Sequence, residues 1–203
     1  MDTLLCVANF PASTGYAWTF IGQMFAEVAN ALASLGMTLQ LERKLDAALP
    51  LLERAVAIHV ARQGPRHSAT AIAKLAHADA LLWRGDFRAA AATLEDAIPV
   101  LREAHGKDHP YTASGMTDLG RAYLGLGRAK DALPVLEHAL RVQEAAKDPD
   151  WVAVTRFSLA RALWETGGDR ARARALARAA AEFPGTLIAP DLDAKTWLRR
   201  HGE

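Results

Sequence analysis

The sequence predicts an all-α fold: an α-solenoid, or superhelix, of about four antiparallel helix pairs that ends in a C-terminal capping helix. Recurrence of similar segments at a spacing of 42 residues is the first observation behind this prediction. The run GPRHSAT at 64–70 returns as GKDHPYT at 106–112, and LLERAVAI at 51–58 returns as TLEDAIPV at 93–100 and VLEHALRV at 135–142. A fixed period of this length is typical of stacked repeats, in which each unit buries its apolar face against its neighbours.

Helical spacing of apolar residues inside each segment is the second observation. In the third segment Met116, Leu119 and Tyr123 recur at i, i+3 and i+7, which puts them on one face of a first helix. Gly127 ends that helix, because glycine tolerates the left-handed backbone of a helix end. A second helix follows, with Ala132 on its inner face. Each segment therefore predicts one helix pair.

The repeated connector combines a helix end with a helix start. Gly106 closes one helix, and His109-Pro110 opens the next, because proline at the first helical position loses no hydrogen bond. Two antiparallel helices pack roughly 8–10 Å apart, so only small residues fit where they cross most closely. The first helices carry such residues at equivalent places: Gly36, Ala78, Gly120 and Ala160.

The register divides the chain into six parts. Residues 1–21 match nothing in the pattern and stay unassigned, and residues 189–203 form the predicted cap, with Trp197 and Leu198 against the last repeat. The four repeats span 22–63, 64–105, 106–146 and 147–188. In the first of them Arg43 stands where the others have a turn glycine.

Composition excludes several function classes. The formal net charge of +1 gives no general attraction to nucleic acid or to an anionic membrane. The N-terminal stretch is apolar but lacks a basic start and is interrupted at Pro11 and Gly15, so we expect neither a signal peptide nor a membrane-spanning helix. Cys6 is the only cysteine, which favours a cytoplasmic location.

Catalytic and metal-binding patterns are also missing. The sequence contains no G-x-S-x-G, H-E-x-x-H or phosphate-binding G-x-x-x-x-G-K-[ST] motif. His105 and His109 are four residues apart, but Gly106 and Pro110 break the helix that would align them as ligands. We therefore predict no enzyme activity, no cofactor and no metal.

The motif of the helix pairs resembles the tetratricopeptide repeat. Its W-x2-L-G-x2-Y…A pattern is similar to Met116-x2-Leu119-Gly120-x2-Tyr123…Ala132 and, in the first repeat, to Leu32-x2-Leu35-Gly36-x2-Leu39…Ala48. The 42-residue period and the G-x-D-H-P connector resemble the kinesin-light-chain subtype, which is common in bacterial multidomain signalling proteins. The resemblance implies a non-catalytic scaffold that binds a protein or peptide in the concave groove of the superhelix.

The resemblance also implies which side chains face the groove, since the first helices of such repeats line it. Arg121 and Arg161 occupy equivalent places in the third and fourth repeats and suit an acidic peptide with apolar side chains. Alternatively, the two arginines pair with neighbouring acids such as Asp118 and Glu165. The full set of groove candidates is Leu75, Asp79, Thr117, Arg121, Leu124, Phe157, Arg161 and Trp164.

The sequence is also compatible with two other roles. One is a structural role, in which the chain forms a homodimer through an end of the solenoid or through residues 1–21. The other is a regulatory part of a bacterial signalling kinase or ATPase system, which the resemblance implies. The arginine-rich run at 169–180 is interpreted as the solvated back of the last repeat, because no aromatic residues for base stacking are interleaved with it.

Overall fold

The protein is described by a computed structural model that covers residues 15–183 and 189–201. Over these residues it contains helices and no strand, which confirms the predicted fold class. The helices in chain order are α1 (Gly15–Leu41), α2 (Leu45–Gln63), α3 (Ser68–Arg84), α4 (Phe87–His105), α5 (Pro110–Gly125), α6 (Ala129–Ala146), α7 (Pro149–Glu165), α8 (Arg170–Ala181) and α9 (Ala194–His201).

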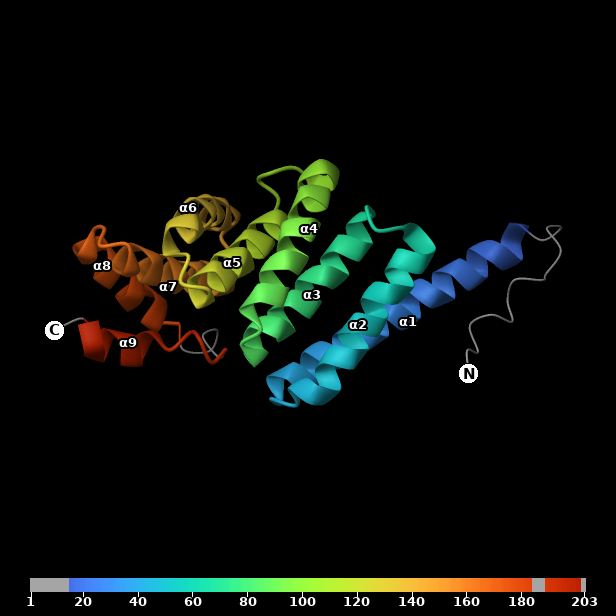
Figure 1. Ribbon diagram of the computed structural model, residues 1–203. Coiled ribbons are helices and arrows are strands. Elements are labelled where there is room, and N and C mark those ends of the chain that lie inside the picture. The colour runs from blue at the N-terminus through green and yellow to red at the C-terminus, as the bar shows by residue number, and fades with distance from the viewer. Residues whose placement is uncertain (1–14, 184–188, 202–203) are drawn as a thin grey trace.

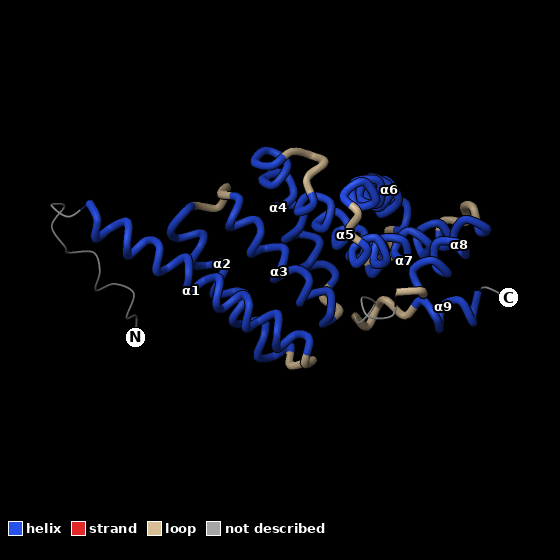
Figure 2. The backbone as a smooth tube through the Cα atoms, turned by 180° about the vertical axis from the view of Figure 1, so that it is seen from behind, coloured by secondary structure: helices blue, strands red, loops and turns tan. Residues whose placement is uncertain are grey.

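The helices pack as four consecutive antiparallel pairs that stack into an elongated array (Figure 1). Each second helix also packs on the first helix of the next pair, and the first helices α1, α3, α5 and α7 contact one another in turn. The view from behind shows the same succession, with α9 set against the C-terminal pair (Figure 2). We call the surface formed by the four first helices the inner groove.

The repeated connector is held by one glycine, one histidine and one threonine. Gly106 has a φ angle of 94° and ends α4, and the Nδ1 atom of His109 accepts a hydrogen bond of 3.2 Å from the N–H of Tyr111. The hydroxyl of buried Thr112 donates to the carbonyl of Gly106 at 2.9 Å. Histidine therefore caps the new helix, and threonine ties that helix to the end of the previous one.

The connector that starts at Gly64 repeats this arrangement 42 residues earlier. His67 accepts a hydrogen bond from the N–H of Ala69 at 3.1 Å, and Thr70 donates to the carbonyl of Gly64 at 2.8 Å. In the last pair Asp148 takes over the capping role and accepts from the N–H of Trp151 at 3.3 Å. The two connectors are similar in sequence because they make the same hydrogen bonds.

The predicted small residues lie where the paired helices approach most closely. A Cβ atom added to Gly120 would lie 2.5 Å from Leu136, and one added to Gly36 would lie 2.7 Å from Leu52. Ala78 and Ala160, at the equivalent places, are fully buried. The prediction that these positions admit only small side chains is therefore confirmed.

The turn inside the first pair uses a residue that is not glycine. Arg43 has a φ angle of 61°, in the region that Gly85, Gly127 and Gly167 occupy in the later pairs, at 87°, 70° and 71°. A side chain with a Cβ atom is strained in this conformation, typically by about 1 kcal/mol relative to glycine. The fold thus keeps the turn geometry even where the sequence departs from the pattern.

At both ends the described helices continue beyond the four predicted repeats. Helix α1 starts at Gly15, seven residues before the expected start of the first repeat. Helix α9 falls inside the region expected to form the cap. Residues 1–14, 184–188 and 202–203 lie outside the described residues, so the expectations for most of the N-terminal segment and for the end of the fourth repeat lie there too.

Candidate functional site

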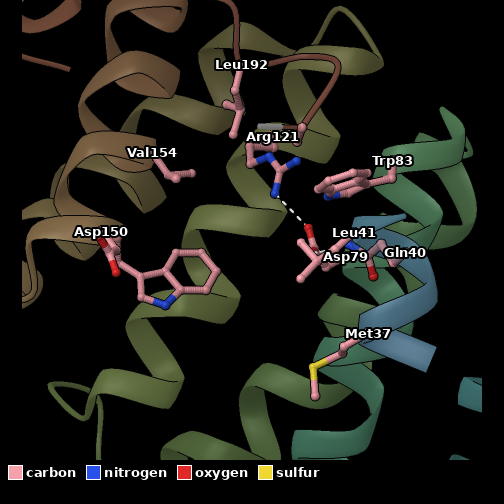
Figure 3. Close-up of a pocket in the computed structure, with 11 residues that line it drawn as sticks. Met37, Gln40, Leu41, Asp79, Trp83, Arg121, Asp150, Val154 and Leu192 are labelled. Atoms are coloured by element: carbon pink, nitrogen blue, oxygen red, sulfur yellow. Dashed lines mark hydrogen bonds and ion pairs between the residues drawn. The ribbon is translucent and has the colours of Figure 1, made fainter. Parts of the chain in front are cut away.

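Arg121 of α5 lies at the centre of the inner groove and is surrounded by carboxylates. Its Nη1 atom is 2.9 Å from Asp79 Oδ1, on α3, and 2.8 Å from Asp118 Oδ1, one turn earlier on α5. Gln40 of α1 donates to the other oxygen of Asp79 at 2.7 Å. Figure 3 shows Arg121 and Asp79 pointing toward each other across the groove. The side chain of Arg121 is only 3% exposed, so these contacts are made away from bulk water.

A third carboxylate comes from the segment that precedes α9. Asp191 accepts two hydrogen bonds from Arg121, from Nε at 3.1 Å and from Nη2 at 2.8 Å. Its backbone carbonyl accepts a further bond of 3.2 Å from Arg161 of α7. Arg161 also lies 3.8 Å from Glu165. The alternative in which both arginines pair with acids of the same chain is therefore what the structure contains.

The charge balance of this cluster shifts the pKa values of its members. Burial and the nearby Asp79 raise the pKa of Asp118 from 3.8 to about 8. Burial acts to lower the pKa of Arg121, but Asp191, Asp79 and Asp118 together raise it well above its ordinary value. Burial acts to raise the pKa of Asp191, but Arg121 outweighs it and lowers that pKa. Asp118 is the member whose charge changes near neutral pH.

Aromatic residues of the fourth repeat pack against α9. The ring of Trp197 meets Phe157 edge-on at a centroid distance of 6.1 Å and Trp164 at 5.4 Å. The guanidinium groups of Arg170 and Arg174 lie 4.8 Å and 5.5 Å from the ring centroid of Trp164. Both predicted aromatic groove residues are thus in contact with other parts of the same chain.

A cavity of about 360 Å³ remains open beside the Arg121 cluster (Figure 3). Its apolar lining combines residues from α1, α3, α7 and the segment before α9: Met37, Leu41, Trp83, Trp151, Val154 and Leu192. Gln40, Asp79, Arg121 and Asp150 supply its polar edge. Apolar walls with a few polar groups are typical of sites that hold a ligand side chain.

The structure gathers part of the predicted groove set and buries the rest between helices. Asp79, Arg121 and Arg161 meet in the cluster described above. Leu75, Thr117 and Leu124 lie inside the helix packing. Thr117 is fully buried, where its hydroxyl lies 2.7 Å from that of Thr155. As a set that binds a partner, the eight residues stay a prediction.

Several site residues escaped the sequence reasoning. Asp191 belongs to the segment after the last repeat, so no 42-residue register points to it. Trp83 and Trp151 also line the cavity, but they carry no repeated signal of their own.

Two negative findings apply to the described residues only. Among them, no three His, Cys, Asp or Glu side chains are grouped in a way that could hold a metal ion. Within the same residues, no helix combines the length and the apolar character needed to cross a membrane.

Comparison with known proteins identifies the family. The family model of the tetratricopeptide repeat (TPR) matches residues 27–103 and, in an overlapping register, residues 70–145. These matches together cover more than half of the chain. The chain belongs to the tetratricopeptide repeat family. No curated protein matches it in sequence.

Solved structures similar to this TPR chain are kinesin-light-chain-like. Nearly identical TPR-like repeats from Podosopora anserina, described as those of a putative kinesin light chain, superpose with a TM-score of 0.66 at 20% identity. That match covers 87% of this chain and 90% of the other, and a point variant of the same repeats gives the same values. BtubC (BKLC) from P. vanneervenii gives a TM-score of 0.64 at 20% identity, over 77% of this chain and 65% of the other. At this identity the likeness shows the fold.

Proposed function

We propose that this TPR chain is a non-catalytic scaffold whose inner groove holds an extended segment of a protein partner. TPR folds generally serve as protein-binding scaffolds, which supports the class of function. The cytoplasmic location and the association with a bacterial signalling kinase or ATPase stay predictions.

The observation that carries the proposal is the way in which the groove already holds residues 191–192. Arg121 grips the Asp191 carboxylate with two hydrogen bonds, and Arg161 binds the backbone carbonyl of the same residue. The side chain of Leu192 is buried next to them. Side chain, backbone and apolar contacts together are what a groove needs to hold an extended peptide.

The open cavity indicates which side chains a partner brings. Its walls of Trp83, Trp151 and Met37 favour a large apolar or aromatic anchor, because such anchors contribute most to protein interfaces. Asp150 is exposed at the edge of the cavity, and Arg121 is already bound to three aspartate side chains. A basic residue beside the anchor therefore fits this part of the groove better than a further acid does.

A photo-crosslinking amino acid at position 41 tests the proposal in the full chain. Leu41 lines the cavity and is 60% exposed, so the change leaves the core intact. The matched control carries the crosslinker at Lys130, an exposed position on α6 outside the cavity. We expect position 41 to capture a defined partner segment that position 130 does not capture.

A synthetic copy of the captured segment then gives the affinity by calorimetry. Trp151→Ala and Met37→Asp should each weaken its binding about tenfold or more, which corresponds to about 1.4 kcal/mol. Lys130→Ala should leave the affinity unchanged. Equal capture at both positions, or unchanged affinity in the cavity variants, would contradict the proposal.

A further inference from the structure

An apolar strip lies exposed along the outer side of α1. Met24, Val28 and Leu35 are 49%, 46% and 51% exposed, and Ala31 between them is exposed as well. Their spacings of four, three and four residues align them along one line of the helix. Helix α1 holds five of the eight exposed large apolar residues in the part of the chain that the structure describes, so the strip is a local concentration.

The later repeats show which interface this strip corresponds to. In the 42-residue register Val28 corresponds to Thr70 and Thr112, which are fully buried against the preceding helix pair. Leu35 corresponds to Leu119, which is also buried. The same face of α1 therefore has the position of an inter-repeat interface, but no described helix covers it. Apolar faces of this kind mark protein–protein contacts.

Length and charge distinguish α1 further. Ser68, the first residue of α3, corresponds to residue 26 of α1, yet α1 starts eleven residues earlier and projects past the end of α2 (Figure 1). Glu27 is the only charged residue in its 27 residues. A long helix with almost no charge is poorly suited to standing alone in water, and it offers little repulsion to another apolar helix.

We infer that this strip binds the same strip of a second copy of the chain, with the two α1 helices antiparallel. The spacing of four, three and four reads identically from either end, so a two-fold axis between residues 29 and 30 brings the strips into register. Met24 then faces Leu35 of the second copy, and Val28 faces Ala31. These are the pairings of an antiparallel coiled-coil seam, and the small Ala31 permits close approach.

The arrangement keeps the single charged residue of α1 out of the seam. Glu27 is exposed on the flank of the strip and lies level with Leu32 of the second copy, so the two apolar strips meet without a buried charge. The strip residues are exposed, so none of the described helices α2 to α9 covers the strip. The inference is independent of the proposed groove function, which uses the other side of α1.

Light scattering after gel filtration of the full chain tests the self-association. We expect a concentration-dependent species with twice the 21.9 kDa mass of one chain. The double change Val28→Glu and Leu35→Glu should abolish this species while leaving the circular dichroism spectrum helical. Leu41→Glu, on the groove side of the same helix, is the matched control and should still form the dimer. A monomer at every concentration, or a dimer that survives the double change, would overturn the inference.

Disulfide trapping tests the orientation and does not rely on a disruptive variant. In a Cys6→Ser background, chains with Met24→Cys are mixed with chains with Leu35→Cys and oxidised. Antiparallel pairing predicts the mixed disulfide, because the two Met24 positions of a dimer would lie about 16 Å apart at a rise of 1.5 Å per residue. A disulfide between two Met24→Cys chains, or no mixed product, would overturn the antiparallel arrangement.

Discussion

Arg121 and Asp191 are seventy residues apart in the sequence and form a two-pronged ion pair, with Nε–Oδ2 and Nη2–Oδ1 distances of 3.1 Å and 2.8 Å. This pair fixes the segment before α9 to the centre of the inner groove. Substituting Arg121 and substituting Asp191 should have different effects on stability. Arg121 also contacts Asp79 and Asp118, whereas Asp191 has only one other arginine contact, from Arg161.

Asp191→Ala should release the segment without unfolding the solenoid. Arg121 keeps Asp79 and Asp118, so we expect a loss of about 1–3 kcal/mol in the free energy of unfolding. Hydrogen exchange followed by mass spectrometry should show faster exchange in residues 189–201. Asp150→Asn, an exposed change in the same groove, should leave that exchange as it is. Unaltered protection of α9 in Asp191→Ala would show that the ion pair does not hold the segment.

Arg121→Met should cost more than Asp191→Ala. It leaves Asp79, Asp118 and Asp191 without their shared partner, and loss of one partner of a buried ion pair amounts to roughly 3–5 kcal/mol. Urea unfolding curves of the two variants give the comparison. A smaller loss for Arg121→Met than for Asp191→Ala would mean that the carboxylates find other partners or water.

Asp118 should make the protein less stable as the pH rises. Its pKa is about 8 in the folded chain and near 3.8 when unfolded, so the folded state holds the proton more tightly. The contribution of Asp118 to the free energy of unfolding is complete below the unfolded-state pKa of 3.8. It is lost as the pH rises through the folded-state pKa of about 8. Asp118→Asn should therefore flatten the fall in the free energy of unfolding between about pH 4 and about pH 8. Urea titrations at several pH values measure it, and a parallel fall in the variant would exclude Asp118 as the source.

The close crossing of α5 and α6 should not tolerate a larger side chain. Ala132 is fully buried, so Ala132→Leu should cost roughly 1–3 kcal/mol and lower the melting temperature. Lys130→Leu, exposed on the same helix, is the matched control and should change the melting temperature far less. Equal shifts in the two variants would contradict the assigned inner face.

The hydroxyl of Thr112 in the connector should contribute measurably to the free energy of unfolding. Thr112→Val keeps the shape but leaves the carbonyl of Gly106 without its hydrogen bond, at a cost of about 1–3 kcal/mol. Thr93→Val removes a hydroxyl that donates to the carbonyl of Ala89 in the same helix, at an exposed site, so it should cost less. Chemical denaturation of both variants provides the comparison, and an equal loss would assign Thr112 no special role.

The fold was largely predictable because the same local sequence features recur in successive repeats. Glycine ends, histidine caps and small residues at crossings act over a few residues, and their recurrence at 42-residue spacing made them recognisable. Arg43 shows that the array tolerates one departure, since its neighbours impose the turn.

The candidate site was only partly predictable. Asp79 and Arg121 share a register position, and in the structure their side chains contact each other. Thr117 was assigned to the groove by the same rule, yet it bonds Thr155 and Gln143 between the helices. A small rotation of a first helix decides between groove and interior, and one sequence contains no signal for it. The contact of Asp191 depends on how the chain returns after the last repeat, which the repeat pattern does not determine.

A line of polar contacts runs along the inner groove from Gln40 through Asp79, Arg121 and Asp191 to Arg161. Helix arrays of this kind normally couple only nearest neighbours, so they melt from their ends in steps. Here one continuous line joins the first helices of all four pairs and draws in the segment beyond the last. We therefore expect the array to unfold more cooperatively than nearest-neighbour packing alone would allow, with loss of order at the C-terminal end reaching α1.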